Sequence, residues 1–358
     1  MDAMKRIAII VHGLSGGGAE RVASLLASYL AENRYEVLFI CAYHTPEEDS
    51  KAPYPLDSRV TVKYIPVKTN ISPLRFMARS VRIRQAVKAF SPDWVVSLIT
   101  YEAILTTFSK YPVVYSLRND PGRSMAQGFR SKLLLFMFSR AKKIVFQSQG
   151  ARDFFQSEIK EKSVVIPNPI NTKELPLWTD YAHEKKFMTA CRLRGQKNLP
   201  MLAEAFSMVH REHPDYTLEI YGQGDQESVI KEKIQSLHAE SYIFLKGFSA
   251  DVHGVMARSS GFVLSSNHEG LSNSMLEALC IGVPCVCTDC PPGSVREYII
   301  NGENGFLTKV GDAQDMKEKI CALIENQDLS PAFAQRNLAV REKMDVEFIC
   351  KEWAQLFE

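Results

Sequence analysis

The stretch that decides the fold lies between residues 261 and 282 and is GFVLSSNHEGLSNSMLEALCIG. GFVLSS is a short apolar run typical of a buried strand, NHEGLSN is a polar turn with a glycine, and SMLEALCIG is rich in helix-forming residues. Gly282 and Pro284 end that helix. A strand, a turn and a helix N-terminus place backbone N–H groups at the carboxyl edge of a sheet. Such an edge favours phosphate binding, through the helix dipole and the unpaired donors.

Two acidic residues accompany this predicted phosphate site. Glu269 lies in the turn and Glu277 one to two turns into the helix, so both carboxylates can face one cleft from different depths. We expect the N–H groups of Leu271, Ser272 and Asn273 to meet phosphate, and the acids to meet the hydroxyl groups of a ribose and a hexose. The pattern suits a sugar nucleotide. On chemistry alone an ordinary strand–turn–helix with two solvated glutamates stays open, since acids near a helix start are common.

Predicted strands and helices alternate through both halves of the chain, which indicates parallel, doubly wound sheets. At 358 residues the chain is too long for one typical core. The proline-rich stretch 164–178 breaks the alternation and is expected to join two domains. After the strand PCVCTD, which begins at Pro284, only helices are expected. We therefore predict an α/β fold of two Rossmann-like domains facing a cleft, over residues 1–165 and 166–340, with a helix at 341–358 packing back toward the first.

Composition points to a soluble globular protein, because 46% of the residues are hydrophobic and 23% are charged. No stretch approaches the 18 apolar residues of a membrane span, and the N-terminus leads straight into a strand and a glycine-rich loop rather than a signal peptide. Eight cysteines, mostly in apolar segments, favour reduced thiols and a cytoplasmic location. Cys280, Cys285, Cys287 and Cys290 cluster, but without a histidine or a usual spacing we expect packing and no metal.

Charge is distributed unevenly between the two halves. Residues 1–165 contain 24 Lys and Arg against 14 Asp and Glu, and the remainder contains 19 against 27. The basic excess concentrates in residues 68–143, where a helix over 74–90 has Arg79 beside an apolar stripe. This favours contact with anionic lipid at the inner face of the cell membrane, or a lipid-linked diphosphate acceptor. A core-facing stripe with solvated arginines stays open, and nucleic acid is disfavoured because exposed aromatics are not interleaved with the cations.

Two further loops have phosphate-binding character. Gly16, Gly17 and Gly18 follow the first predicted strand, where they predict either a phosphate loop or a tight structural turn. The dinucleotide fingerprint is absent in register. Arg192 and Lys197 follow the first strand of the second domain, where a forked and a point cation suit a pyrophosphate. A solvated basic loop is the alternative there.

Two more loops follow strands of the second domain. Gly222 lies in YGQGDQ and Phe248 ends KGF. Ligands of open α/β sheets bind outside the carboxyl ends of the strands, so both loops are candidates for contact with a nucleotide base. Ordinary turns without a binding role would have similar sequences, so that alternative stays open for both loops.

The motifs, taken in order, resemble a known family. GGGAERV, NPIN, RLRGQK, HEGLSNSMLEAL with its two acids, GVPCV and NGENGFL are similar to the pattern of retaining GT-B glycosyltransferases of family 4, the type that builds bacterial capsule and lipopolysaccharide. The resemblance implies that the second domain holds a nucleotide sugar, usually a UDP-sugar, without a metal or other cofactor. It also implies transfer of a hexosyl group to a lipid-linked or growing surface polysaccharide.

The resemblance also assigns roles to residues. Arg192 and Lys197 would neutralise the leaving diphosphate, where charge develops in the transition state. Glu277 would hold the ribose and Glu269, counted with the two cations as catalytic, the hydroxyls of the transferred sugar. The Gly17–Gly18 loop would close over the phosphates from the acceptor domain.

Two positions depart from the family pattern. Many members have a histidine where this chain has Arg118, and Cys191 replaces a glycine. Arg118 cannot act as a base, so any role of it would be to orient substrate or phosphate, and we expect Arg118 and Asn119 to lie on the acceptor side. A sugar-nucleotide epimerase of similar architecture and a catalytically silent nucleotide-binding partner subunit stay open as alternatives.

Overall fold

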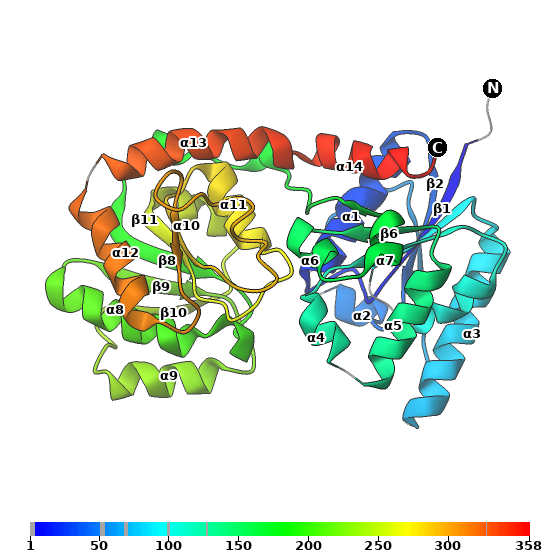
Figure 1. Cartoon of the computed structure of the whole chain (residues 1–358), viewed down its shortest axis with the longest axis horizontal. Coiled ribbons are helices and arrows are strands. Elements are labelled where there is room, and N and C mark those ends of the chain that lie inside the picture. The colour runs from blue at the N-terminus through cyan, green and yellow to red at the C-terminus, as the bar shows by residue number, and fades with distance from the viewer. Residues whose placement is uncertain (1–3, 51–53, 68–70, 99–100, 127, 327) are drawn as a thin grey trace. The chain divides into compact units, whose positions relative to one another are not determined.

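The computed structural model describes residues 4–50, 54–67, 71–98, 101–126, 128–326 and 328–358. The chain forms two compact units: the first consists of Met1–Pro169 and Val346–Glu358, and the second of Ile170–Asp345 (Figure 1). The units change at residue 170 rather than 166, and the chain returns to the first unit at 346 rather than 341. The first unit is therefore discontinuous in sequence.

The first unit is built on a seven-stranded parallel sheet of order β3-β2-β1-β4-β5-β6-β7. Because the chain moves from β1 outward to β3 and then returns beside β1 with β4, the strand order reverses between β1 and β4. The strands are β1 (Arg6–Val11), β2 (Glu36–Cys41), β3 (Thr61–Tyr64), β4 (Trp94–Leu98), β5 (Val113–Leu117), β6 (Lys143–Phe146) and β7 (Ser163–Val165).

Helices cover both faces of this sheet, and each face has its own apolar core. One core joins α1 and α14 to the sheet, with Trp353 and Phe357 of the C-terminal segment fully buried. The other joins α3 and α5, through residues such as Ile83 and Phe138. The helices are α1 (Gly18–Glu32), α2 (Pro46–Asp49), α3 (Ser72–Phe90), the 3₁₀ helix η1 (Tyr101–Phe108), α4 (Pro121–Met125), α5 (Phe129–Arg140), α6 (Gln149–Asp153), α7 (Ser157–Glu161) and α14 (Val346–Gln355).

The second unit has a six-stranded parallel sheet of order β10-β9-β8-β11-β12-β13, so its strand order reverses between β8 and β11. Both sheets are doubly wound, and the α/β prediction is confirmed. The strands are β8 (Glu184–Ala190), β9 (Thr217–Tyr221), β10 (Ile243–Gly247), β11 (Ser259–Leu264), β12 (Cys285–Thr288) and β13 (Phe306–Thr308). The helices are α8 (Leu199–Glu212), α9 (Glu227–Ser236), α10 (Val252–Arg258), α11 (Asn273–Ile281), α12 (Ala313–Glu325) and α13 (Leu329–Met344), with 3₁₀ turns η2 (Thr172–Glu174), η3 (Trp178–Asp180) and η4 (Gly195–Lys197).

The expectation that only helices follow β12 is wrong, because β13 adds a sixth strand there. The turn before β13 is closed by a hydrogen bond in which Gly302 N donates to Gly305 O at 2.8 Å. Phe306 follows this turn and pairs with β12 at the edge of the sheet. The Asn304 side chain holds the same turn by accepting from Ile300 N at 2.7 Å. A strand of three residues is too short to show the periodicity on which the prediction relied.

Charge within α3 also differs from the prediction. Arg79 is buried rather than solvated, with its guanidinium 4.0 Å over the Tyr43 ring and 3.8 Å from Glu102. Arg75 and Arg82 on the same helix are exposed. Among the described residues no helix combines the length and apolarity that crossing a membrane requires.

Candidate functional site

The reversal of strand order in the second sheet creates the main candidate site. After β8 the chain runs to β9 and β10 on one side, whereas β11 continues to β12 and β13 on the other. The loops that leave the carboxyl ends of β8 and β11 therefore diverge, and a crevice at such a point is the usual ligand site of an open α/β sheet. These two loops, residues 191–198 and 265–272, contain the three residues predicted to be catalytic, Arg192, Lys197 and Glu269.

A nearly buried ion pair joins the two loops. Lys197 Nζ donates to Glu269 Oε1 at 2.5 Å, and Ser266 Oγ donates to the same oxygen at 2.6 Å. The side chains are only 14% and 6% exposed. Burial alone would lower the pKa of Lys197, but the adjacent Glu269 carboxylate outweighs it and raises that pKa, so Lys197 stays an ammonium at neutral pH.

Backbone and amide contacts fix the ion pair in place. Asn267 N donates to Gln196 O at 2.8 Å, and Ser265 Oγ donates to Lys197 O at 2.7 Å. The amides of Asn198 and Asn267 are linked at 3.0 Å. Because the β8 and β11 loops are bonded at three points, the charged groups at their ends are held without ligand, which is the preorganisation a binding site needs.

Arg192 lies in the same β8 loop but is exposed. Its guanidinium has no hydrogen-bond or ion-pair partner among the residues that the structure describes. The backbone beside it is fixed by the β9 loop, since Leu193 N donates to Gln223 O at 3.0 Å. Gly222 has φ +127°, and a Cβ added there would overlap the Cys191 carbonyl oxygen. The glycine thus lets the two loops touch, whereas the donor-binding role expected for it stays a prediction.

Helix α11 begins where the sequence placed the phosphate-binding turn. Ser272 is the N-cap residue, and its Oγ accepts from Met275 N at 3.4 Å. Leu271 and Ser272 are buried, and Asn273 is the first helical residue. The positive end of the helix dipole therefore lies at the end of the loop that contains Glu269, which follows the carboxyl end of β11. Contact between these three N–H groups and a phosphate stays a prediction.

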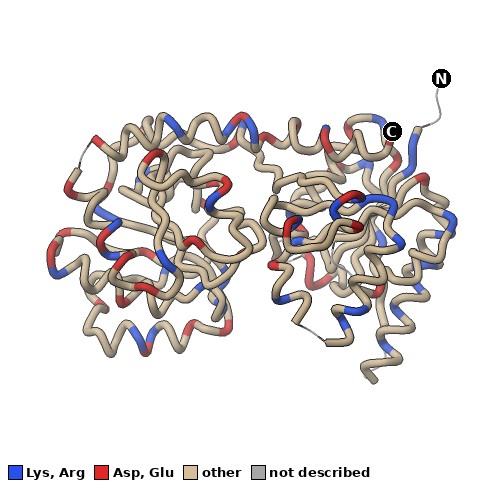
Figure 2. Tube along the Cα trace, viewed as in Figure 1, with Lys and Arg blue, Asp and Glu red and all other residues tan. Residues whose placement is uncertain are grey.

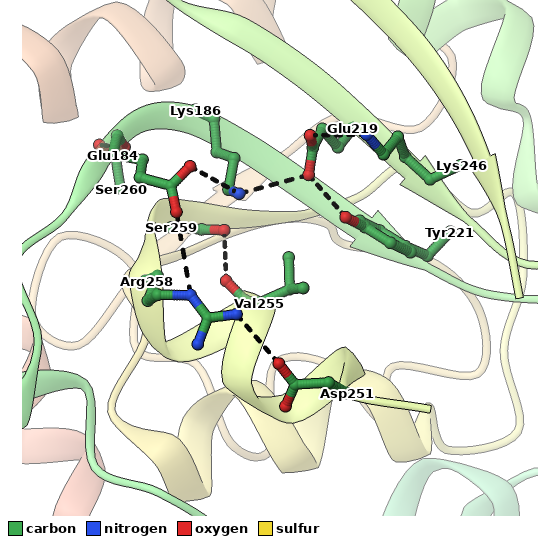
Figure 3. Close-up of polar contacts among 10 residues, drawn as sticks. All are labelled: Glu184, Lys186, Glu219, Tyr221, Lys246, Asp251, Val255, Arg258, Ser259 and Ser260. Carbon is green, nitrogen blue, oxygen red and sulfur yellow. Dashed lines mark hydrogen bonds and ion pairs between the residues drawn. The ribbon is translucent and has the colours of Figure 1, made fainter. Parts of the chain in front are cut away.

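Glu277 lies on α11 with a buried carboxylate, and Oε1 is 3.4 Å from His253 Nε2 on α10. Helix α10 is in turn tied to the sheet. Arg258 Nη2 donates to Asp251 Oδ2 at 3.0 Å, and Arg258 Nε is 3.8 Å from Glu184 Oε1 of β8 (Figure 3). These contacts hold α10, the helix that contains His253, against β8.

A second part of the same polar network ties three strands together. Glu219 of β9 accepts from Tyr221 Oη at 2.7 Å, and it lies 3.4 Å from both Lys186 Nζ of β8 and Lys246 Nζ of β10 (Figure 3). Burial opposes ionisation of Glu219, but these partners outweigh it and lower its pKa. The network fixes β8, β9 and β10, and Arg192, Gly222 and Phe248 lie in the loops that follow these strands. The Phe248 ring is 74% exposed, and its contact with a base stays a prediction.

The sequence reasoning missed a buried cluster at the reversal point of the first sheet. Glu102 follows β4 and accepts from Tyr43 Oη, which follows β2. Arg79 Nη1 lies 3.8 Å from the same carboxylate. Glu102 Oε2 and Arg79 Nε are both buried without a hydrogen-bond partner among the described residues. Buried polar atoms of this kind need a ligand or water to satisfy them, so the cluster is a second candidate subsite.

His12 and Glu20 border this cluster and flank the glycine loop. His12 directly follows β1, and its Nδ1 is 3.7 Å from Glu20 Oε1 on α1. Burial is the main cause that lowers the pKa of His12, although Glu20 and Glu102 act against it. Gly17 is the N-cap residue of α1. His12 and Glu20 lie on either side of the glycine loop in the sequence. Because this loop follows the end of β1, its position could have identified both residues as candidates.

Arg118 follows β5 and is buried. Its Nη1 donates to Ser116 Oγ at 3.3 Å and its Nη2 to Asn168 Oδ1, an amide of the NPIN motif. Asn119 beside it is exposed. The guanidinium thus fixes the last residues of the first domain against β5. The acceptor-orienting role expected for Arg118 and Asn119 stays a prediction.

The four clustered cysteines, Cys280, Cys285, Cys287 and Cys290, are free thiols, fully buried among apolar side chains. Burial raises the pKa of Cys280 and of Cys290 to about 12, so both stay protonated at neutral pH.

Comparison with known proteins agrees with this geometry. Residues 16–174 match the family model described as Glycosyltransferase Family 4, and residues 178–339 match that described as Glycosyl transferases group 1. Two relatives, a glycosyltransferase of Haemophilus influenzae without assigned activity and the amylovoran biosynthesis glycosyltransferase AmsD of Erwinia amylovora, are each 25% identical over 364 residues, 98% of this chain and 99% of the relative.

Among solved structures, HepE of Anabaena in complex with UDP aligns with a TM-score of 0.81 at 19% identity, covering 99% of each chain. The two Rossmann-like units thus form a GT-B fold. With a family 4 match on the first unit and a group 1 match on the second, the chain belongs to the GT-B glycosyltransferases of the group 1 and family 4 type.

Proposed function

We propose that this glycosyltransferase moves a hexosyl group from a UDP-sugar to a growing surface polysaccharide on a lipid-linked acceptor, with retention at the anomeric carbon and without a metal ion. The observation that carries the proposal is the preorganised Lys197–Glu269 pair at the β8/β11 reversal, with Glu269 in the loop that leads into α11. A cation, a carboxylate and a helix N-terminus in one crevice suit a sugar diphosphate.

The charges in the crevice support the proposal that transfer proceeds without a metal. Breaking the bond between the sugar and the β-phosphate leaves negative charge on the diphosphate, and the acceptor hydroxyl gives its proton to an oxygen of the departing diphosphate as the new glycosidic bond forms. An ammonium has three N–H donors, of which Glu269 takes one from Lys197, so two can bind phosphate oxygens. Arg192 is exposed beside it and adds a forked donor. These groups stabilise the developing charge that a divalent cation would otherwise meet.

Glu269 serves two functions in this proposal. Its Oε1 accepts from Lys197 and Ser266, which holds the ammonium toward the diphosphate. Its second oxygen is the acceptor for a hydroxyl of the transferred sugar. Glu277, fixed against His253, is the acceptor for the ribose hydroxyls. A uridine donor is supported by the UDP in the HepE complex and a polysaccharide product by the name of AmsD, although both concern other proteins.

The acceptor sugar binds in the first unit under this proposal. The unsatisfied Glu102 Oε2 and Arg79 Nε offer one acceptor and one donor in a buried site, which is the complement of a saccharide hydroxyl. His12 and Glu20 add polar groups at the glycine loop.

A lipid-linked acceptor calls for contact with a membrane surface, and α3 has the side chains for it. Leu74, Met77 and Val81 are exposed and three or four residues apart, so they form an apolar stripe on its solvent face. Arg75 and Arg82 flank the stripe, and Figure 2 shows basic residues along the length of α3. Exposed apolar residues bordered by cations suit the inner, anionic face of the cell membrane.

Donor turnover tests the proposal. The protein is incubated with a panel of UDP-hexoses and lipid-diphosphate saccharides in EDTA, and products are followed by mass spectrometry. We expect a product one hexose larger, with its configuration read by NMR, and a loss of roughly 10²-fold or more in kcat for Lys197→Met and Glu269→Gln. Lys231→Met, on the surface of α9, is the control and keeps full activity. UDP-sugar conversion without acceptor, or equal turnover in all variants, rejects the proposed reaction and site.

A further inference from the structure

A second cluster of ligand-type side chains lies at the far end of α8. Glu212 is the last residue of α8 and His213 its C-cap, while Cys321 and Glu325 lie on α12, which packs against α8 (Figure 1). One oxygen from each glutamate, one imidazole nitrogen and the thiol sulfur all lie within 4.8 Å of one another.

The spacing of these atoms matches a tetrahedral zinc site. With Zn–N and Zn–O bonds of about 2.1 Å and Zn–S of about 2.3 Å, the edges of a tetrahedron are roughly 3.3–3.7 Å. His213 Nε2 lies 3.3 Å from Glu325 Oε1, and Cys321 Sγ lies 3.7 Å from Glu212 Oε2. Two pairs of the four groups are therefore already at the distances of tetrahedron edges, and the ligand atoms of all four groups lie no more than 4.8 Å apart.

Burial separates the four ligands into two pairs. Cys321 is buried and the His213 ring is 19% exposed, with Nε2 shielded from solvent and without a hydrogen-bond partner among the described residues. The two glutamates are exposed and form the solvent side. The imidazole nitrogen and the thiol sulfur would bind an ion from the buried side. The two exposed carboxylates can adjust to it and leave a path by which it enters from solvent.

Lys317 fits the same arrangement as an outer partner. Its Nζ lies 2.7 Å from Glu212 Oε1, while the other carboxylate oxygen faces the thiol. A cation bonded to the distal oxygen of a carboxylate orients the oxygen that ligates, as outer partners do in metal sites.

We propose that Glu212, His213, Cys321 and Glu325 bind one Zn²⁺ that clamps α8 to α12. Sulfur, nitrogen and carboxylate oxygen together suit Zn²⁺ better than the harder Mg²⁺ or Ca²⁺. As the Zn–S bond forms, the thiol proton leaves to solvent. Helix α8 has 14 residues, so about 20 Å separates this site from Lys197. The ion therefore stabilises the second unit and takes no part in sugar transfer.

Cobalt and zinc titrations of the full chain test the site. After EDTA treatment and its removal, one equivalent of Co²⁺ should give the thiolate-to-cobalt band and the intense visible bands of tetrahedral cobalt, and Zn²⁺ should abolish them. The bands should vanish in Cys321→Ser and weaken in Glu325→Gln, whose exposed position makes misfolding no explanation. Cys191→Ala, which removes a thiol outside the proposed site, should keep them.

Stability gives an independent readout. At Zn²⁺ about a hundredfold above its Kd, the melting temperature should rise by roughly 5 °C in the parent and the Cys191→Ala control, and by less than 1 °C in Cys321→Ser and His213→Ala. Cobalt bands that survive in Cys321→Ser, or a zinc shift of the same size in all four proteins, would overturn the proposal.

Discussion

At the scale of single residues, the Lys197–Glu269 pair is both a structural element and a binding group. Because both side chains are nearly buried, removing one partner leaves an uncompensated charge. Lys197→Met or Glu269→Gln should each lower the free energy of unfolding of the second unit by about 3 kcal/mol. The double variant should lose at least 1 kcal/mol less than the sum of the two.

Urea denaturation of the four proteins measures this coupling. The exposed pair of Lys231 and Glu227, 2.7 Å apart on α9, is the control, and Lys231→Met should cost less than about 0.5 kcal/mol. Additive losses for Lys197 and Glu269 would show that the pair has no energetic link.

Gly222 tests the contact between the β8 and β9 loops. Alanine there adopts an unfavourable φ and overlaps the Cys191 carbonyl, so the loop that contains Arg192 has to move. Gly302→Ala is the matched control, since its φ of +80° is also unfavourable but nothing lies within 4 Å of the added Cβ. We expect Gly302→Ala to cost about 1 kcal/mol and Gly222→Ala clearly more. Only Gly222→Ala should also raise the Kd for UDP, measured by calorimetry, and an unchanged Kd would separate this loop from the donor site.

At the scale of elements, α14 closes the core of the first unit over α1. Trp353 is fully buried there, and the Phe357 ring is 5.9 Å from that of Trp94. Trp353→Ala should destabilise the first unit by about 3–5 kcal/mol, because it removes the largest buried side chain of the helix. Phe348→Ala on the exposed face of the same helix is the control and should cost under 1 kcal/mol. Equal midpoints of urea unfolding for the two variants would contradict this packing argument.

Helix α3 tests the membrane contact. Leu74→Glu with Met77→Glu replaces two exposed apolar side chains by acids, so neither change disturbs the core. In sedimentation with vesicles in which roughly a third of the lipid is anionic, this variant should bind at least tenfold more weakly than the parent protein. The control Gln85→Glu, Lys88→Gln leaves the apolar stripe intact and should bind more weakly only at low salt. Unchanged sedimentation of the Leu74 and Met77 variant would remove α3 from the interface.

At the scale of the whole molecule, the two units have separate cores, so ligands should act on them separately. UDP at about a hundredfold above its Kd should add roughly 2.7 kcal/mol to the stability of the second unit. In hydrogen exchange we expect protection of residues 191–198 and 265–277 on UDP addition, with α5 of the first unit as the internal control. Protection confined to the first unit would place the nucleotide elsewhere.

Much of this architecture was predictable because strands such as β1 and β11 contain short apolar runs, IAIIV and GFVL, and are followed by loops that contain glycine. What the sequence could not predict was which residues pair with one another across the fold. Lys197 and Glu269 are 72 residues apart, and only the reversal of strand order brings them together. The pairing of Glu102 with Arg79 was missed for the same reason, since a buried charged pair has no local periodicity. β13 was missed because three residues give no pattern.

The first unit is interrupted in sequence by the second, and this affects how the protein is made. A ribosome that has completed residues 1–169 has synthesised the seven strands but not Ile349 or Trp353, which fill the hollow over α1. That nascent half exposes an apolar surface until another 176 residues have emerged, whereas the later half holds every residue of its own core. We therefore expect chaperones to bind the first-synthesised half more than the later one. A chain truncated before residue 346 would keep this apolar surface exposed and would be more readily degraded by proteases.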